Sequence, residues 1–129
     1  MRTNIRKEGD YTIVELSGFI DVESAEPVAE FIEETFESNE KTKMIVDMSN
    51  LRFVGSTGIS NFVKEIRVFN KMRMKPTYYG MRSEFVRIFR LHEDQDKFDI
   101  VNSVDDAKRQ ALARFVEWQA ATERSKETH

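Results

Sequence analysis

The sequence predicts a single α/β domain with a mixed β-sheet of four to five strands and about four α-helices. Its 129 residues suit one domain, because two would each be too small to bury a core. A hydrophobic fraction of 40% beside 33% charged residues is the balance of a folded globular chain, not a disordered one. Strand and helix patterns alternate after an initial hairpin, which implies a sheet whose parallel part is covered by crossover helices.

The chain begins with a pattern typical of a β-hairpin. The stretch "GDYTIVELSG" has turn residues at both ends and a β-branched, apolar centre over residues 12–16, which predicts a strand. The preceding "TNIRKE" is expected to pair with it around Glu8, Gly9 and Asp10.

A helix and a buried strand are predicted next. In "DVESAEPVAEFIEETFES", Ser24 can cap a helix that places Pro27 in its first turn, where a missing N–H costs nothing. The apolar face of this helix is Val28, Phe31, Ile32 and Phe36. The following "KMIVDM" is short and continuously apolar around Ile45 and Val46, as expected of a central strand covered on both faces.

A second helix is predicted after "GSTG", residues 55–58. Its apolar positions recur at helical spacing and form one stripe: Ile59, Phe62, Val63, Ile66 and Phe69. A β-strand is then predicted in "KPTYYGM", between Pro76 and Gly80.

The last third of the chain predicts a helix, a strand and a final helix. Ser83 is expected to cap the helix "SEFVRIFRL", whose inward residues are Phe85, Ile88 and Phe89. The run "KFDIVN" follows as a short strand. Ser103 followed by Asp106 resembles a capping box and starts a helix that reaches at least Phe115. Residues 122–129 are charged and polar, and we expect them to be frayed.

Composition argues against several classes of function. A net charge of −3 without a basic stripe argues against direct binding of nucleic acid. The absence of cysteine excludes thiolate zinc sites, and His92 and His129 are too few and too far apart for a histidine site, so we expect no metal and no cofactor. The first 18 residues lack the apolar core of a signal peptide, and no apolar run is long enough to span a membrane. We therefore expect a cytoplasmic protein without membrane insertion.

The "GSTG" turn is the candidate functional position, because it follows the carboxyl end of a central strand in an open sheet. Ser56 has no evident catalytic base, and "GSTGI" is not the Gly-x-Ser-x-Gly elbow of a hydrolase. The stretch "VGSTGISN" also lacks the length and the lysine of a phosphate-binding loop. We therefore do not expect an enzyme. From the residues alone, the simplest role of Ser56 is to cap the following helix.

Three stretches of the sequence resemble a known domain family, and this resemblance adds a candidate function for the "GSTG" turn. "IVDMSNLRFVGSTGISNFV" resembles the signature of STAS domains of the bacterial anti-sigma-factor-antagonist family, in which a hydrophobic strand leads through Asp-Ser-Ser/Thr-Gly into an apolar helix. "VELSGFIDVESAEPV" resembles the second strand and first helix of the family, with its pattern at Gly18, Asp21 and Ala25. "SEFVRIFRLHEDQDKFDIVNSVDDA" resembles the third helix through the start of the last. The resemblance implies a STAS-like domain over residues 1–115, followed by a C-terminal helix extension and charged tail over residues 116–129.

The resemblance implies a role in signal transduction and transcription regulation. Ser56 matches the phosphorylated serine of the family, and Thr57 matches the hydroxyl residue beside it and is the less favoured target. In similar proteins the unmodified chain binds an anti-sigma factor or serine/threonine kinase, phosphorylation abolishes that binding, and a phosphatase can reverse it. The acidic residue that usually precedes the serine is Gly55 here. A STAS module that binds without phosphorylation, such as a scaffold or a subunit of a transport complex, stays open as the alternative.

The resemblance also implies a partner-binding surface around Ser56. Its members are Asp21, Gly55, Ser56, Thr57, Gly58, Asn61, Lys64, Met81, Arg82 and Ser83. Ordinary solvated roles are an alternative for the polar ones. Phe115, Val116 and Trp118 extend the final helix beyond the usual end of the family, where they can cover an edge of the core or form a homodimer contact.

Overall fold

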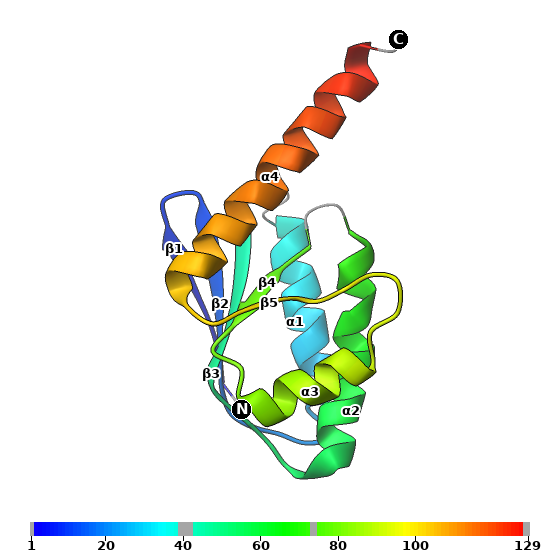
Figure 1. Cartoon of the computed structure of the whole chain (residues 1–129). Coiled ribbons are helices and arrows are strands. Elements are labelled where there is room, and N and C mark those ends of the chain that lie inside the picture. Colours follow the sequence, from blue (N-terminus) through cyan, green and yellow to red (C-terminus); the bar gives the residue numbers. More distant parts are fainter. Residues whose placement is uncertain (1, 39–42, 73–74, 128–129) are drawn as a thin grey trace.

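The computed structural model describes residues 2–38, 43–72 and 75–127, and the side chains of Ser56 and of residues 124–127 lie outside the described part. Its described strands form one sheet in the order β1-β2-β3-β4-β5. The strands are β1 (Arg2–Glu8), β2 (Tyr11–Ile20), β3 (Lys43–Phe53), β4 (Thr77–Tyr79) and β5 (Asp99–Val101). The helices are α1 (Ala25–Ser38), α2 (Gly55–Ile66), α3 (Ser83–Leu91) and α4 (Val104–Glu127), with a 3-10 turn η1 (Arg67–Lys71) after α2 (Figure 1). The predicted α/β class and mixed sheet are confirmed.

The sheet combines one antiparallel pair with a parallel remainder. β1 pairs antiparallel with β2, which confirms the hairpin predicted around Glu8, Gly9 and Asp10. Glu8 lies opposite Tyr11, so the turn itself consists of Gly9 and Asp10. Gly9 supplies a positive φ of +58° for this turn. β2, β3, β4 and β5 are all parallel to one another. The strand order places β3 at the centre of the sheet.

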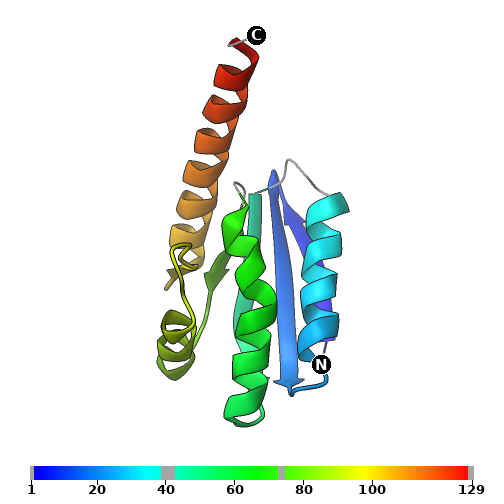
Figure 2. The same cartoon turned by 90° about the vertical axis from the view of Figure 1, so that its right-hand side faces the viewer.

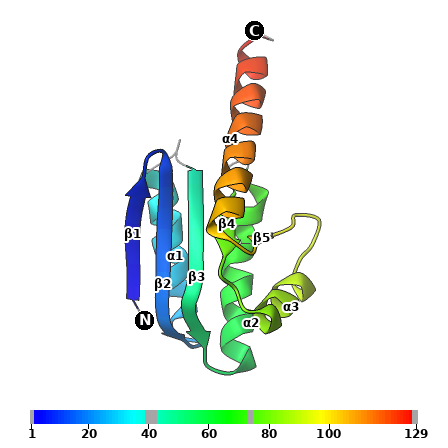
Figure 3. The ribbon, with the colours of Figure 1, turned by 60° about the vertical axis from the view of Figure 1, so that its left-hand side comes forward.

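Helices cover both faces of the sheet. α1, α2 and α3 lie on one face and α4 lies on the other (Figures 2 and 3). Residues 43–48 of β3 are therefore buried, as predicted for a strand covered on both sides. The predicted stripe of α2 is buried against the sheet: Ile59, Phe62, Val63, Ile66 and, in η1, Phe69.

An aromatic cluster fills the core beneath α2 and α3. The ring centroids of Phe89 and Phe98 are 5.2 Å apart, and those of Tyr78 and Phe98 are 5.9 Å apart. Phe62 joins from α2, with its centroid 6.2 Å from that of Phe89. Because each ring buries a large apolar area, these contacts hold α2 and α3 in place over the sheet.

Several predicted boundaries are corrected by the structure. β3 does not end near Met48 but continues to Phe53, because β2 keeps pairing with it past a bulge near Glu15. Ser83 is not the cap of α3, since Arg82 occupies the N-cap position and Ser83 is the first helical residue. The fourth helix continues to Glu127, through the residues expected to be frayed.

The capping residue of α4 is confirmed. The N–H of Asp106 donates to Oγ of Ser103 at 3.1 Å. This bond satisfies one of the free amides of the first turn, as expected for an N-cap serine.

Two neighbouring tyrosines give a matched test of the core. Tyr78 is fully buried, and its hydroxyl has no hydrogen-bond partner within the described part of the chain. Tyr78→Phe should therefore raise the free energy of unfolding by about 1 kcal/mol. The Tyr79 hydroxyl donates to Oδ2 of Asp47 at 3.0 Å. Tyr79→Phe should therefore lower the free energy of unfolding by about 1–2 kcal/mol. Urea denaturation measures both values, and equal destabilisation by the two variants would contradict this account of the core.

Candidate functional site

The pairing of β2 with β3 brings two loops to the same edge of the sheet. Ile20 at the end of β2 lies opposite Phe53 at the end of β3. The N–H of Val54 then donates to the carbonyl oxygen of Ile20 at 2.9 Å. The start of α2 is thus fixed beside the loop that joins β2 to α1.

The α2 tip, defined here as residues 55–58, begins with a sharp change of backbone direction. Gly55 has a φ of +71°, in the left-handed region that favours glycine. Val54 holds the N-cap position and makes no side-chain capping bond. Ser56 therefore lies within the first helical turn, and its prediction as the N-cap is wrong. Gly55 and Thr57, on either side of Ser56, are exposed.

Gly58 allows the α2 tip to approach Asp21. A Cβ atom at position 58 would lie 3.3 Å from both the Cα of Asp21 and the carbonyl oxygen of Ile20. Such contacts are tight, and a larger residue would push α2 away from the β2–α1 loop. A glycine here keeps the first turn of α2 against Asp21.

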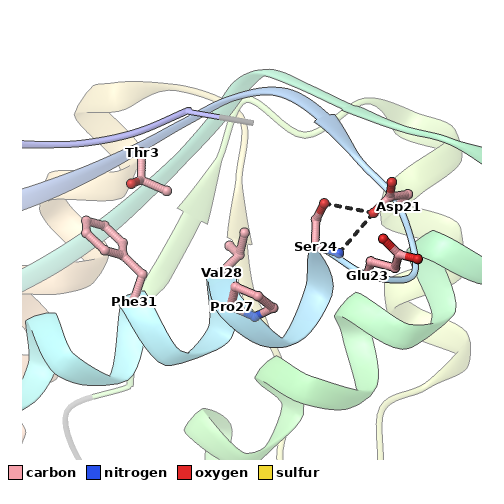
Figure 4. A pocket seen from close by; sticks show the side chains of 7 residues that line it. All are labelled: Thr3, Asp21, Glu23, Ser24, Pro27, Val28 and Phe31. Carbon is pink, nitrogen blue, oxygen red and sulfur yellow. Dashed lines mark hydrogen bonds between the residues drawn. The ribbon is translucent and has the colours of Figure 1, made fainter.

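Asp21 carries a fixed negative charge at this edge. Its Oδ1 accepts hydrogen bonds from the Ser24 hydroxyl at 2.8 Å and from the Ser24 N–H at 2.9 Å (Figure 4). The Ser24 hydroxyl, followed by its N–H, lowers the pKa of Asp21. Asp21 is exposed, so this oriented carboxylate is open to solvent.

A cleft of about 420 Å³ adjoins Asp21, and the sequence analysis did not predict it. It is lined by Thr3, Asp21, Glu23, Ser24, Pro27, Val28 and Phe31 (Figure 4). Asp21 and Glu23 make one end acidic, whereas Phe31 and its neighbours in α1 form an apolar wall. The spacing of Pro27 and Phe31, four residues apart on one helical face, was the signal available in the sequence.

Asn61 and Lys64 lie on the outer side of α2. Together with Thr57 they are spaced by four and three residues, which places all three along one helical face. Asn61 is half-buried and Lys64 is exposed. This stripe continues the surface of the α2 tip along the helix.

Met81, Arg82 and Ser83 lie at the same end of the sheet. Arg82 and Ser83 are exposed, and Met81 is partly buried against the core. The rings of Phe53 and Phe85, with centroids 4.7 Å apart, join the end of β3 to the first turn of α3. The loops that lead into α1, α2 and α3 therefore share one end of the sheet (Figure 3). That these residues bind one partner stays a prediction.

The same edge exposes apolar side chains that the sequence analysis did not single out. Phe19 in β2 is 63% exposed, and Val22 and Val54, which follow the ends of β2 and β3, are also exposed. Phe19 lies opposite Arg52 in the strand pairing. Exposed apolar side chains next to charged ones are typical of protein-binding surfaces, and their place at two strand ends was the available signal.

Within residues 2–38, 43–72 and 75–127, no group of three His, Cys, Asp or Glu side chains is arranged to hold a metal ion. None of the helices in these ranges is both long and apolar enough to cross a membrane.

Comparison with known proteins confirms the resemblance found in the sequence. The family described as STAS domain matches residues 2–107. An anti-sigma factor antagonist from Mycobacterium paratuberculosis has the same fold, with 18% identity, a TM-score of 0.64, and coverage of 86% of this chain and 93% of that chain. No curated protein sequence matches the chain.

Two further solved structures share the fold. The phosphorylated form of the Bacillus cell fate determinant SpoIIAA aligns with 12% identity and a TM-score of 0.55, over 86% of this chain and 99% of that chain. The murine anion transporter Solute Carrier 26 family member A9 aligns with 16% identity and a TM-score of 0.63, over 84% of this chain but only 18% of that chain.

The charge on Asp21 depends on its hydrogen bonds, which can be tested by titration. We expect the pKa of Asp21, followed by NMR, to lie below 3.8 and to rise in Ser24→Ala. The pKa of Asp21 is lower in the folded state than in the unfolded state. Its contribution to stability is therefore present at neutral pH and is lost as the pH falls through the folded-state pKa. The pKa of Asp106, lowered by Arg109 and Ser103, serves as the control and should not move. An unchanged Asp21 pKa in Ser24→Ala would contradict this assignment.

The backbone at Gly55 gives a second test of the site. No atom lies within 4 Å of a Cβ built at this position, so a substitution meets conformational strain and no clash. Gly55→Ala should lower the free energy of unfolding by about 1–2 kcal/mol, because alanine disfavours a positive φ. Gly55→Asn should cost clearly less, since asparagine tolerates that region. Equal stability of wild type and Gly55→Ala in urea denaturation would show that the turn is not strained.

Proposed function

The chain is a member of the STAS domain family, and we propose that it is a regulatory binding protein of the anti-sigma-factor-antagonist type. The observation that carries this proposal is the position of the α2 tip. Ser56 lies between two exposed residues in the first turn of α2, and Gly58 of the same turn lies against the charged Asp21. A serine between two exposed residues, at an edge that the strand pairing fixes, suits a binding surface that one modification can change.

The proposed partner is an anti-sigma factor or a serine/threonine kinase. It would contact the α2 tip, the stripe with Asn61 and Lys64, and the turn at Met81, Arg82 and Ser83. The exposed Phe19 and Val54 add apolar area, and Asp21 adds a charge that orients the partner. In this proposal the chain acts by binding alone, without catalytic residues, metal or cofactor.

Phosphorylation of Ser56 is the proposed switch. A phosphate adds about −1.5 to −2 charge, and the N-terminus of a helix favours such a charge by about 0.3–2 kcal/mol. The N-cap residue Val54 makes no side-chain bond that would compete for the helix amides. The free domain should therefore accept the phosphate without a change of fold.

The same phosphate should disrupt a complex. Within an interface shaped for a neutral hydroxyl, a dianion loses its water and costs on the order of a few kcal/mol. Asp21 lies against the first turn of α2 and already carries a negative charge, so the modification concentrates like charges at one edge. Because about 1.4 kcal/mol is a tenfold change in affinity, this penalty is enough to empty the complex. A phosphatase would restore binding.

Gly55 sets this chain apart from the pattern of its family. The positive φ of Gly55 suits glycine better than the acidic residue that usually precedes the serine. The kinase and the partner would therefore have to recognise an α2 tip without a charge at position 55. A kinase or partner that requires the acidic residue would not bind this chain.

A constitutive binding module is the alternative function. The fold similarity to one part of a murine anion transporter favours it, because that part makes up only 18% of a much larger chain. In such a role the domain would hold a scaffold or transport complex together, and a charge at Ser56 would not affect binding.

The switch can be tested by affinity capture from a lysate of the native host, followed by mass spectrometry. Wild type and Ser56→Ala should retain the same anti-sigma factor or kinase, and Ser56→Asp should retain at least tenfold less. Ser60→Asp is the matched control, because it places the same charge one turn further along α2. If wild type and all three variants retain the same scaffold or transport subunit, the switch is overturned and the constitutive module is favoured.

A further inference from the structure

The second half of α4 projects beyond the body of the domain (Figures 1 and 2). Its first half is anchored, since Ala107 and Ala111 are buried against Ile13 and Ile45 of the sheet. Arg114 also pairs with Asp99 at 3.0 Å. Beyond Phe115, the helix continues to Glu127 away from the sheet and the other helices.

The anchoring ends with a cation–π contact. The Lys43 ammonium lies 4.5 Å from the ring centroid of Phe115 and 5.2 Å from that of Tyr11. The rest of the helix then lies away from the sheet and the other helices (Figure 2). A helix of this length is marginal in water, because most helical stability in proteins comes from packing of an apolar face. This half of α4 is therefore expected to pack against something.

An apolar stripe lies on the outer side of α4. Leu112, Val116 and Ala120 are spaced by four residues, and the first two are 45% and 54% exposed. At 100° per residue, this stripe faces away from the buried Ala107 and Ala111. Arg109 stands at its beginning and Glu123 at its end, and both are exposed.

We propose that this stripe binds the α4 helix of a second copy of the chain in antiparallel orientation, with Val116 at the two-fold axis. In this register Leu112 of one protomer faces Ala120 of its partner. Arg109 of one protomer then faces Glu123 of its partner, and the symmetry repeats this ion pair at the other end. In a parallel arrangement each charge would face its own copy, so the charge pattern selects the antiparallel pair.

The side chains fit this arrangement. Arg109 contacts Asp106 of its own helix, but its side chain remains 75% exposed and can reach across to a second helix. Ala113 and Ala120 are small and exposed, which allows the two helices to approach closely. One helix per protomer is a small contact, so we expect a weak dimer with a Kd of about micromolar.

The dimer leaves the candidate site free. The carboxyl end of α4 and the α2 tip lie at opposite ends of the molecule (Figure 1). The proposal therefore does not rest on the proposed function, and either can fail without the other. A dimer would present two α2 tips, which raises the avidity for a partner that is itself dimeric.

Sedimentation equilibrium of the full chain tests the dimer. At about 100 micromolar, well above the expected Kd, the mass should approach twice the chain mass of 15.2 kDa. Val116→Glu should return it to the mass of one chain. Val68→Glu, at a residue that is 59% exposed in η1, is the matched control and should remain dimeric. A monomeric wild type, or a dimer unaffected by Val116→Glu, would overturn the proposal.

Cross-linking tests the register and does not depend on the glutamate variant folding. The chain has no cysteine, so each introduced thiol is unique. Under oxidation, Val116→Cys should form a disulfide-linked dimer, whereas Leu112→Cys alone should not. The double variant with Leu112→Cys and Ala120→Cys should cross-link again. Efficient cross-linking of Leu112→Cys alone would indicate a parallel pair and overturn the assignment.

Charge reversal tests the orientation. Arg109→Glu should weaken the dimer about tenfold, because it removes two symmetry-related ion pairs and creates repulsion. Adding Glu123→Arg to this variant should restore wild-type affinity. Failure of the double variant to recover would show that Arg109 and Glu123 do not face each other.

Discussion

The parallel pairing of β2 with β3 is the constraint on which the rest of the site depends. It places Ile20 opposite Phe53, so that Asp21 and the α2 tip leave the sheet side by side. The bond from Val54 N–H to the Ile20 carbonyl oxygen extends this pairing by one residue into the turn. Since β3 is buried on both faces from residue 43 to residue 48, the strand that carries the tip is held firmly by the core. The strand pairing therefore fixes the positions of Asp21 and the α2 tip relative to each other.

Sequence patterns predicted the elements that burial dictates. The stripe of α2 and the continuous apolar run of β3 could be read because a buried face must repeat with the period of its element. The N-cap at Val54 could not, because it depends on the positive φ of Gly55, which only the folded turn reveals. The cleft beside Asp21 combines Thr3 of β1 with residues of α1, and the helical spacing of Pro27 and Phe31 alone does not reveal that β1 lies across from them. The full length of α4 was missed because a polar, charged ending resembles a disordered tail.

The two ends of the molecule have different proposed roles. At one end, the α2 tip lies against the loop that holds the Asp21 carboxylate, and a phosphate on Ser56 would change the charge of this surface without requiring a new fold. At the other end, the projecting half of α4 offers an apolar stripe between opposite charges. The core between these two ends includes the aromatic cluster, which holds α2 and α3 in place over the sheet. Binding at either end would therefore leave the fold of the domain unchanged.

The most direct test of this account is a comparison of the chain carrying phosphoserine at position 56 with the unmodified chain, by amide NMR spectra and urea unfolding. If the charge acts locally, chemical shifts should change near residues 21–24 and 54–61, and the free energy of unfolding should stay within about 1–2 kcal/mol of the unmodified value. Shifts spread through buried residues such as Ile45 and Tyr78, together with a larger loss of stability, would show that phosphorylation acts by disrupting the fold. That result would contradict a switch confined to the binding surface.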